Sequence, residues 1–165
     1  MSLTLRPALA TDLSAINAIY NHYVLNSTCT YQTICSTEEE RATWFAAHGE
    51  KHPVIVMEED GVVIAWGSLS RLHERQAFAR SVEDSIYVHH QHQGRGIGRK
   101  LLEELLHLAR EIGHHTVLGA ISADQEASLA LHAKFGFEQM GRLREVGNKF
   151  DRWLDVIWVQ KMIVP

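Results

Sequence analysis

The chain has 165 residues, of which 45% are hydrophobic and 22% are charged, and this excludes a fibrous or disordered protein. The net charge of −4 at pH 7 argues against a general attraction to nucleic acid, so no nucleic-acid partner is predicted. No apolar run approaches the roughly 18 residues of a membrane-spanning helix, and the N-terminus lacks a signal-peptide pattern. We therefore predict a single domain over residues 1–165, located in the cytoplasm and without a membrane partner.

The N-terminal half of the chain combines two helix patterns with short apolar runs. An apolar stripe that begins at Leu13 predicts a first helix, which Thr11 and Asp12 could cap. Ser36 or Thr37 is placed to cap a second helix, because acidic residues at 38–40 fill its first turn, where the helix dipole favours them. Strands are predicted over residues 2–7, 53–58 and 62–70, with a hairpin turn at 58–61.

The C-terminal half alternates strands with helices after an arginine-bearing connection over residues 71–80. Helices are predicted over 97–112 and 125–135, because each carries apolar residues at helical spacing and is followed directly by a glycine. Strands are predicted over residues 81–89, 116–122, 138–146 and 152–162. This mixture of strands and helices in one domain predicts an α+β fold with a mixed sheet.

Three glycines, Gly94, Gly96 and Gly98, lie directly before the leucine-rich helix over 97–112. Glycines leave backbone N–H groups uncovered, and the start of a helix carries about half a positive charge. Together with Arg95 and Arg99 they predict a site for a phosphate or pyrophosphate. A tight turn without a ligand is the alternative. The spacing matches neither the nucleotide-triphosphatase loop nor the dinucleotide-binding fingerprint.

Histidine is frequent in this chain, with 11 residues, and it is clustered at His89, His90 and His92 and again at His114 and His115. A metal site is one interpretation, and a solvated loop with a turn is the other. Neither cluster has the helical spacing of two ligands or the neighbouring cysteine pair that a zinc site favours. We therefore predict no metal.

Four separated segments resemble the GNAT superfamily of N-acetyltransferases. They are SVEDSIYV, HQGRGIGRKLL, EASLALHAKFGF and VGNKFDRWLDVIW. Gln93, Gly96 and Gly98 fill the family's acyl-CoA-binding pattern [QR]-x-x-G-x-[GA]. More narrowly, the segments resemble the phosphinothricin and methionine sulfoximine acetyltransferases. The resemblance implies a mostly antiparallel, twisted sheet flanked by helices, acetyl-CoA as the acetyl donor, and a homodimer.

The resemblance also implies which residues contact acetyl-CoA. The backbone of the strand around Tyr87 would bind the pantetheine arm, and the glycine loop would bind the pyrophosphate. Gln125 stands where the superfamily usually has asparagine, and Lys134 could reach the phosphates or be solvated. The implied set is Ile86, Tyr87, Val88, Gln93, Gly94, Arg95, Gly96, Ile97, Gly98, Arg99, Gln125 and Lys134.

Three residues are candidates for the chemistry of acetyl transfer. Glu83 lies in an apolar strand, where burial would raise its pKa and suit it to accept the proton of an amine; a surface-facing glutamate is the alternative. The resemblance implies that the backbone N–H of Val88 stabilises the oxyanion. His132 stands where many relatives carry a tyrosine acid, so it could act as an acid, as a second base, or as an ordinary helix histidine.

The acceptor is predicted to be a small amine that carries an anionic group. Arginine binds carboxylate or phosphinate through two parallel hydrogen bonds, so Arg80 and Arg152 are candidates beside Arg75 and Lys149, although such a residue is more often a surface charge. His73 replaces a cation found in some relatives. Phe135 could form the pocket floor or pack in the core. The predicted acceptor-binding residues are Tyr31, Arg75, Gln76, Ala77, Phe78, Glu83, Phe135 and Lys149.

The sequence therefore predicts an acetyl-CoA-dependent N-acetyltransferase that acts on the α-amine of a small amino-acid-like compound. Two alternatives stay open. The first is the same chemistry on a polyamine, a peptide N-terminus or a lysine. The second is an acyl-CoA-binding sensor without turnover, which the presence of both Glu83 and His132 disfavours.

Overall fold

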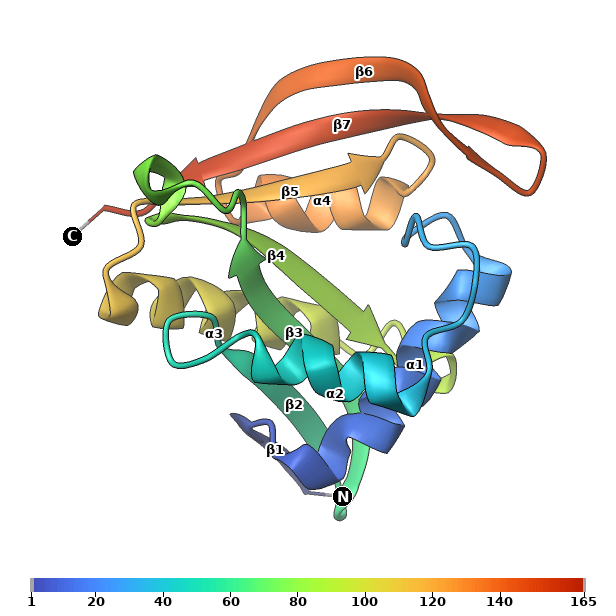
Figure 1. Ribbon diagram of the computed structural model, residues 1–165, viewed down its shortest axis with the longest axis vertical. Coiled ribbons are helices and arrows are strands. Elements are labelled where there is room, and N and C mark those ends of the chain that lie inside the picture. Colours follow the sequence, from blue (N-terminus) through green and yellow to red (C-terminus); the bar gives the residue numbers. More distant parts are fainter. Residues whose placement is uncertain (1, 165) are drawn as a thin grey trace.

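A computed structural model describes residues 2–164 and contains a seven-stranded sheet in the order β1-β2-β3-β4-β5-β7-β6 (Figure 1). All neighbouring strands are antiparallel except β4 and β5, which are parallel. The strands are β1 (Leu3–Pro7), β2 (Val54–Glu59), β3 (Val62–Arg71), β4 (Ser81–Val88), β5 (Thr116–Ser122), β6 (Glu138–Lys149) and β7 (Arg152–Met162). This arrangement confirms the predicted α+β fold with a mixed, mostly antiparallel sheet.

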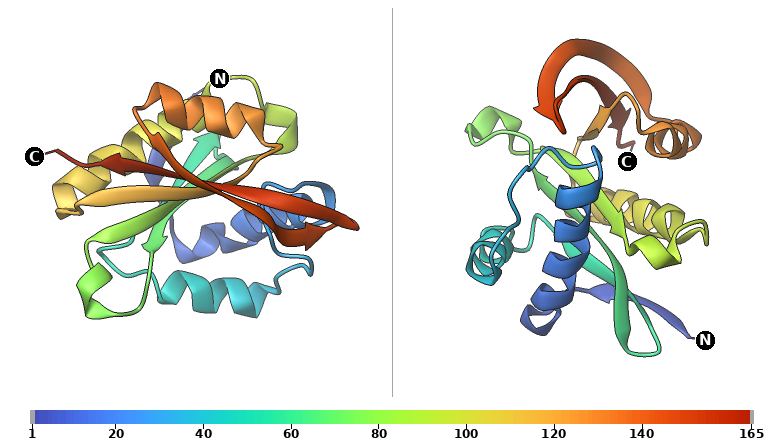
Figure 2. Two further views of the ribbon diagram at one scale, coloured as in Figure 1. Left: turned by 90° about the horizontal axis from the view of Figure 1, so that it is seen from above. Right: turned by 90° about the vertical axis from the view of Figure 1, so that its right-hand side faces the viewer.

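Helices cover both faces of the sheet (Figure 2). They are α1 (Leu13–Asn26), α2 (Glu38–Ala46), α3 (Ile97–Ile112) and α4 (Glu126–Lys134). Helices α1 and α2 lie on one face, and α3 and α4 lie on the other. The predicted ranges 97–112 and 116–122 match α3 and β5, whereas β6 continues to Lys149, three residues beyond its predicted end at 146.

Each face of the sheet has its own hydrophobic core. Helix α3 buries Leu101, Leu102 and Leu105 completely against the sheet, and Gly113, with φ of 91°, ends the helix in the left-handed conformation. On the opposite face, Ile16 of α1 packs in a cluster with Trp66 of β3. The central strands lie between these two cores, and they carry the candidate site.

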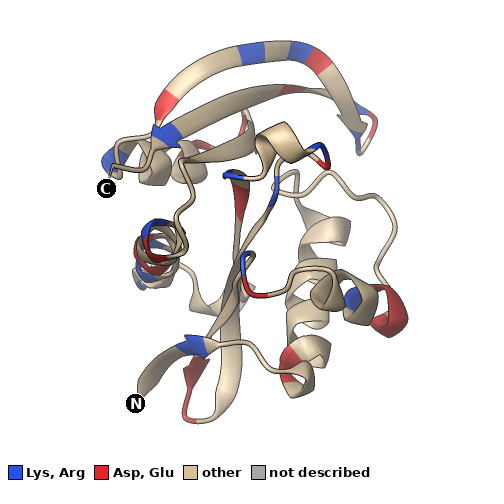
Figure 3. Cartoon of the chain, turned by 60° about the vertical axis from the view of Figure 1, so that its left-hand side comes forward, with Lys and Arg blue, Asp and Glu red and all other residues tan. Residues whose placement is uncertain are grey.

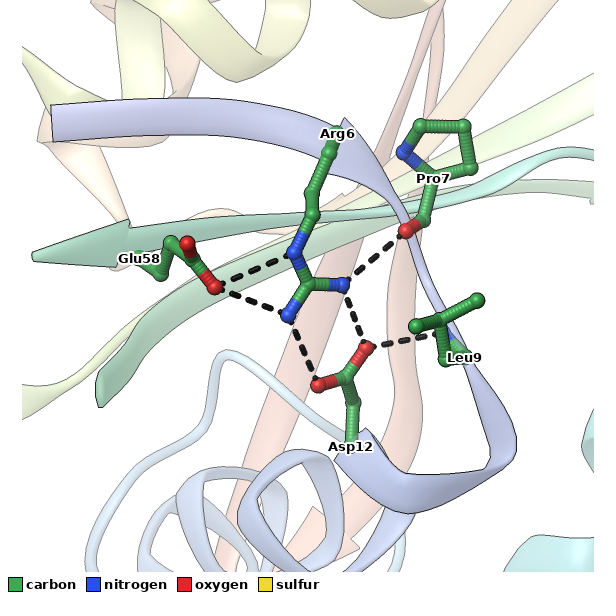
Figure 4. Close-up of polar contacts among 5 residues, drawn as sticks. All are labelled: Arg6, Pro7, Leu9, Asp12 and Glu58. Atoms are coloured by element: carbon green, nitrogen blue, oxygen red, sulfur yellow. Dashed lines mark hydrogen bonds and ion pairs between the residues drawn. The ribbon is translucent and has the colours of Figure 1, made fainter. Parts of the chain in front are cut away.

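The N-terminus of α2 is capped as predicted, but that of α1 is not. Thr37 accepts a hydrogen bond from the N–H of Glu40, whose carboxylate accepts one from the N–H of Thr37. Before α1, a single 3₁₀ turn replaces the expected cap. The carboxylate of Asp12 instead accepts bonds from the N–H of Leu9 and from Arg6, and Arg6 also pairs with Glu58 of β2 (Figure 4). Asp12 thus stands at the N-cap position of α1, as predicted, but neither its side chain nor that of Thr11 caps the helix, because the carboxylate of Asp12 ties the helix start to the sheet.

Strands β4 and β5 are paired only at their beginnings. Their register consists of Ser81 with Thr116, Val82 with Val117, and Glu83 with Leu118. Beyond these residues the two strands diverge (Figure 1). The sheet therefore opens at its centre, and the opening is called the β4–β5 gap below.

None of the helices in residues 2–164 is both long enough and apolar enough to span a membrane. Within the same residues, no cluster of three or more histidine, cysteine, aspartate or glutamate side chains is arranged to hold a metal ion.

Candidate active site

A cavity of about 670 Å³ occupies the β4–β5 gap and extends to the glycine loop before α3. Four parts of the chain line it: the end of α1 with the segment after it, strand β4, the glycine loop with the start of α3, and α4 with the second half of β5. Among the predicted site residues, the cavity is lined by Tyr31, Glu83, Ile86, Tyr87, Val88, Gln93, Gly94, Gly96, Ile97, Gly98, Gln125 and His132. Segments that are far apart in the sequence therefore meet at one site.

The backbone of β4 presents polar groups to this cavity. At one end of the strand the N–H of His89 donates to Ile64, and at the other the N–H of Leu72 donates to Ser81. These bonds place the odd-numbered residues of β4 in hydrogen-bonded register with β3. The N–H and C=O groups of the even-numbered residues, including Ile86 and Val88, therefore point away from β3 and into the β4–β5 gap.

The glycine loop brings uncovered backbone to the mouth of the cavity. Gly94 and Gly96 both have φ of 75°, the left-handed conformation that favours glycine, and Gly96 is the N-cap of α3. A Cβ on Gly98 would lie 3.7 Å from Leu131 and would occupy the space between α3, α4 and β4. The first turn of α3 offers N–H groups without intrahelical acceptors. The loop thus fits the diphosphate of coenzyme A.

The cationic side chains around this loop differ from the prediction. Arg95 is held by Glu59, at 3.1 Å from its Nη1 to Oε2, and it also bonds His92. Arg99 and Lys134 are exposed, and neither they nor Arg95 lines the cavity in the described part of the chain. What favours an anion at the mouth of this cavity is therefore the set of backbone N–H groups and the helix dipole.

Tyr23 of α1 links the glycine loop to β4. Its hydroxyl donates to the carbonyl oxygen of Val88 and accepts a bond of 2.7 Å from the amide of Gln93. Because its carbonyl is already occupied, Val88 offers mainly its N–H to the β4–β5 gap. Gln93 and Val88 had both been predicted as site residues, and Tyr23 connects them.

Gln125 belongs to a second polar chain at the cavity wall. Its Nε2 donates to the hydroxyl of Thr28 at 2.8 Å, and this hydroxyl bonds the carboxylate of Asp124 at 2.8 Å. Thr28 precedes α2 in the segment that follows α1, so the bonds fix that segment to the start of α4. The side chain of Gln125, which is longer than the asparagine usual at this position, therefore reaches the segment after α1.

Glu83 and Tyr31 lie at the same end of the cavity. Burial, and then the charge of neighbouring Asp84, raises the pKa of the Glu83 carboxyl. The pKa of Tyr31 is raised to about 12, first by burial and then by the charge of Glu83. The Tyr31 hydroxyl donates to the carbonyl of Ala120 at 3.2 Å. Glu83 is therefore a carboxylate in a partly dehydrated pocket, which suits a general base.

His132 forms a buried pair with Asp84. Its Nε2 lies 2.9 Å from Oδ2 of Asp84, and its Nδ1 lies 2.7 Å from the carbonyl oxygen of Ser128. Desolvation alone would lower the pKa of His132, but the hydrogen bond and charge of Asp84 outweigh it, and the pKa is raised. Both ring nitrogens of His132 thus have hydrogen-bond partners inside the protein. Neither is free, as the interpretation of His132 as a second base would require.

The predicted acceptor loop lies elsewhere. Arg75, Gln76 and Ala77 line a second cavity of about 540 Å³ near the C-terminal end of α3, and Phe78 is exposed. Lys149 is buried, with its ammonium donating to the carbonyl oxygens of Ser27 and Thr30 at 2.6 and 2.8 Å, and more weakly to that of Tyr23. Its donors therefore anchor the segment after α1.

Phe135 packs at the edge of the core under α3 and does not line the large cavity in residues 2–164. Of the lining residues that sequence analysis missed, Tyr23 and Asp84 are the two whose side chains organise the site through hydrogen bonds. Tyr23 belongs to the apolar stripe of its helix and could not be told from a core tyrosine. Asp84 follows Glu83 directly, and an acid at that position of an apolar strand was the available signal.

Known proteins are similar to this chain in both sequence and fold. Residues 16–137 match the model of the Acetyltransferase (GNAT) family. The L-amino acid N-acyltransferase MnaT of Escherichia coli is 39% identical, over 96% of this chain and 92% of that protein. The L-methionine sulfoximine/L-methionine sulfone acetyltransferase of Salmonella typhimurium is 38% identical, over 96% of this chain and 93% of that protein.

Among solved structures, a GNAT superfamily phosphinothricin acetyltransferase from Sinorhizobium meliloti, in complex with acetyl-CoA, superposes with a TM-score of 0.95. It is 36% identical, over 99% of this chain and 89% of that chain. The fold, the glycine loop and the opened sheet thus agree with the similarity along the whole sequence, and the chain belongs to the GNAT family of acetyltransferases.

Proposed function

We propose that this acetyltransferase transfers the acetyl group of acetyl-CoA to the α-amine of a small amino-acid-like acceptor. Methionine sulfoximine, methionine sulfone and phosphinothricin are the acceptor types considered. The observation that carries the proposal is the position of Glu83, a half-buried carboxylate at the end of the β4–β5 pairing, on the strand that exposes its backbone to the cavity. The names and coverage of the similar proteins support the same acceptor class.

The glycine loop and the start of α3 bind the acyl donor. Backbone N–H groups around Gly96 and the positive end of the helix dipole stabilise a diphosphate. The N–H and C=O groups of Ile86 are available to the extended pantetheine arm, as an added strand would use them. When bound, acetyl-CoA supplies an activated thioester carbonyl.

The chemistry assigned to the protein is proton transfer and charge stabilisation. Glu83 accepts the proton that the amine loses, directly or through a water molecule. The N–H of Val88 donates to the oxygen on which negative charge develops, and such donors contribute about 3–4 kcal/mol in related acyl transfers. Tyr23 supports this donor, because it occupies the carbonyl of the same residue.

The acceptor enters on the side of the segment that follows α1. Tyr31 lies in this segment and lines the cavity near Glu83, and Thr28 is tied to Gln125 across the cavity. These contacts favour a small acceptor over an extended peptide or a polyamine, because the segment covers the base. We do not include the loop over residues 75–78 among the acceptor contacts, because it does not line the large cavity of the same chain.

An acceptor screen tests this function. Purified protein is incubated with acetyl-CoA and with methionine sulfoximine, methionine sulfone, phosphinothricin, spermidine and a lysine peptide, and products are identified by mass spectrometry. Acetylation at the α-amine of the first three compounds is expected. Products from only spermidine or the peptide would replace the proposed acceptor, and thermal stabilisation by acetyl-CoA without any product would identify a sensor instead.

We also propose that the chain forms a homodimer through the β6–β7 hairpin. This hairpin exposes apolar side chains, with Trp153 at 65% and Met140 at 59% exposed, and mixes them with acidic and basic residues along β6 (Figure 3). Exposed apolar groups of this size within one hairpin are typical of an interaction surface.

A further inference from the structure

We propose that Asp84 is a positioning residue of the acetyl transfer. Together with His132, it holds one proton at the closed end of the β4–β5 gap, where that proton is kept for the departing thiolate. This inference rests on the proposed function and adds a residue to it. Asp84 lines the large cavity beside His132, and it lies on the face of β4 opposite to Glu83.

The hydrogen bonds of His132 fix where its protons are. The carbonyl oxygen of Ser128 can only accept, so Nδ1 of His132 carries a hydrogen. Nε2 lies 2.9 Å from Oδ2 of Asp84, so one further proton lies between these two atoms. Whether the proton is assigned to nitrogen or oxygen, the pair has no net charge while the proton is present.

The surroundings require this proton. The side chains of Asp84 and His132 are only 3% and 6% exposed, and Oδ1 of Asp84 has no hydrogen-bond partner in the described chain. A carboxylate with an unpaired oxygen in such a place is costly unless an opposite charge or a proton compensates it. The imidazole of His132 supplies that compensation.

Strand β5 is shaped around the pair. A Cβ on Gly119 would lie 3.0 Å from Oδ1 of Asp84 and 3.6 Å from Nε2 of His132, so the missing side chain leaves the space that the carboxylate occupies. The ring of Phe137 contacts the imidazole edge to face, with centroids 4.9 Å apart. Position 119 lies directly after the last paired residue of β5, so the pair stands where the two strands separate.

Few other ionisable groups face the pair. Glu83 is next to it along β4, but its side chain points to the other sheet face. Strand β5 carries no ionisable side chain, and β7 contributes Val159 beside Gly119 and, on the same face, Lys161, whose ammonium lies against Gly136 at the end of α4. On α4, Glu126 and Lys134 are exposed to solvent. The protonation of His132 is therefore governed mainly by Asp84.

The proton balance of the reaction gives the pair its role. The amide C–N bond forms, the thioester C–S bond breaks, Glu83 takes the proton that the amine loses, and the sulfur takes the proton that the pair holds. The pair is then a carboxylate with a neutral imidazole, and it regains a proton from solvent. Asp84 contributes by keeping His132 protonated and by fixing its ring.

Nitrogen NMR of the imidazoles tests this proposal on the free protein. His132 is recognised by its contact with the Phe137 ring, and its protonation is followed against pH in the wild type, in Asp84→Asn and in the control Asp155→Asn. We expect wild-type His132 to stay doubly protonated above the pH at which an ordinary histidine loses its proton, near 6.5. In Asp84→Asn the midpoint should fall, and in Asp155→Asn it should not change.

Kinetics supply a second measurement. In Asp84→Asn we expect kcat to fall by about 10- to 100-fold, with the KM for acetyl-CoA unchanged, and the loss of activity at high pH should begin at a lower pH. An ordinary or lowered midpoint for His132 in the wild type would overturn the proposal even if the variant did not fold. A midpoint that is the same in wild type and Asp84→Asn would overturn it too. Absence of any acetylated acceptor would instead refute the proposed function, and the NMR titration would still decide the pair.

Discussion

Glu83 of β4 and Leu118 of β5 are the last paired residues before the two strands separate. The candidate base is therefore held by a regular sheet on one side and faces the cavity on the other. Sheet pairing fixes the position of its backbone, while burial removes water from its carboxyl. The position of Glu83 on β4 thus determines both where its carboxyl lies and how strongly that carboxyl binds a proton.

Replacing Glu83 by glutamine should leave the binding of acetyl-CoA intact and lower kcat/KM by about 10²- to 10⁴-fold, because the amide cannot accept a proton. The exposed Glu103→Gln on α3 is a matched control that should keep full activity. Unchanged kcat/KM in Glu83→Gln would exclude this residue as the base. In the wild type, activity should fall with decreasing pH through the raised pKa of Glu83, above the range of an ordinary glutamate.

Gly96→Asp should strongly weaken acetyl-CoA binding, measured by calorimetry. The residue has φ of 75°, and the new carboxylate would place negative charge where the diphosphate is proposed to bind. Gly61→Asp is the control, because Gly61 has φ of 84° in the β2–β3 hairpin and carries the same strain away from the cavity. Normal affinity in Gly96→Asp would refute the assignment of the loop.

Asp12→Asn should reduce the free energy of unfolding at neutral pH by about 1–3 kcal/mol, because Arg6 loses a charged partner. The hydrogen bond from Arg6 lowers the pKa of Asp12, so its contribution is present above the unfolded-state pKa and disappears as pH falls through the folded-state pKa. Urea unfolding at neutral and acidic pH measures both values. A stability difference that stays constant into acid would contradict this linkage.

Trp153→Glu should convert the proposed dimer to a monomer, because it places a charge within the exposed apolar hairpin. Sedimentation velocity at several protein concentrations measures the change. Leu25→Glu, at a residue 60% exposed on α1, is the control and should keep the assembly of the wild type. A wild-type chain that sediments as a monomer would refute the dimer itself.

Much of the fold could be predicted from local pattern. The leucine spacing and the following Gly113 gave both ends of α3, and apolar alternation gave the strands. The caps of α1 and α2 had equally good signals, yet only Thr37 caps its helix. The carboxylate of Asp12 is used by Arg6, six residues earlier on β1, and Arg6 is itself shared with Glu58 of β2, which is distant in sequence.

The candidate site was predictable where backbone conformation decides it. Gly94 and Gly96 adopt the left-handed φ that the choice of glycine at these positions indicated. Side-chain partners were not predictable in the same way. Arg95 pairs with Glu59 from a different hairpin, and Lys149 turns inward to carbonyl oxygens of the segment after α1. Long, flexible lysine and arginine side chains bind whichever acceptors the tertiary structure brings near. The spacing of residues in the sequence does not indicate which acceptors these are.

The three-pair contact between β4 and β5 is the only hydrogen-bonded seam that joins strands β1 to β4 with strands β5 to β7 in the described chain. A longer seam would bury more backbone and strengthen the protein, but it would also close the space in which the substrates meet. Resistance to unfolding and catalytic competence are therefore opposed at this place. A variant selected for thermostability in which β4 and β5 pair over more residues should be more stable than the wild type and should lose its catalytic activity.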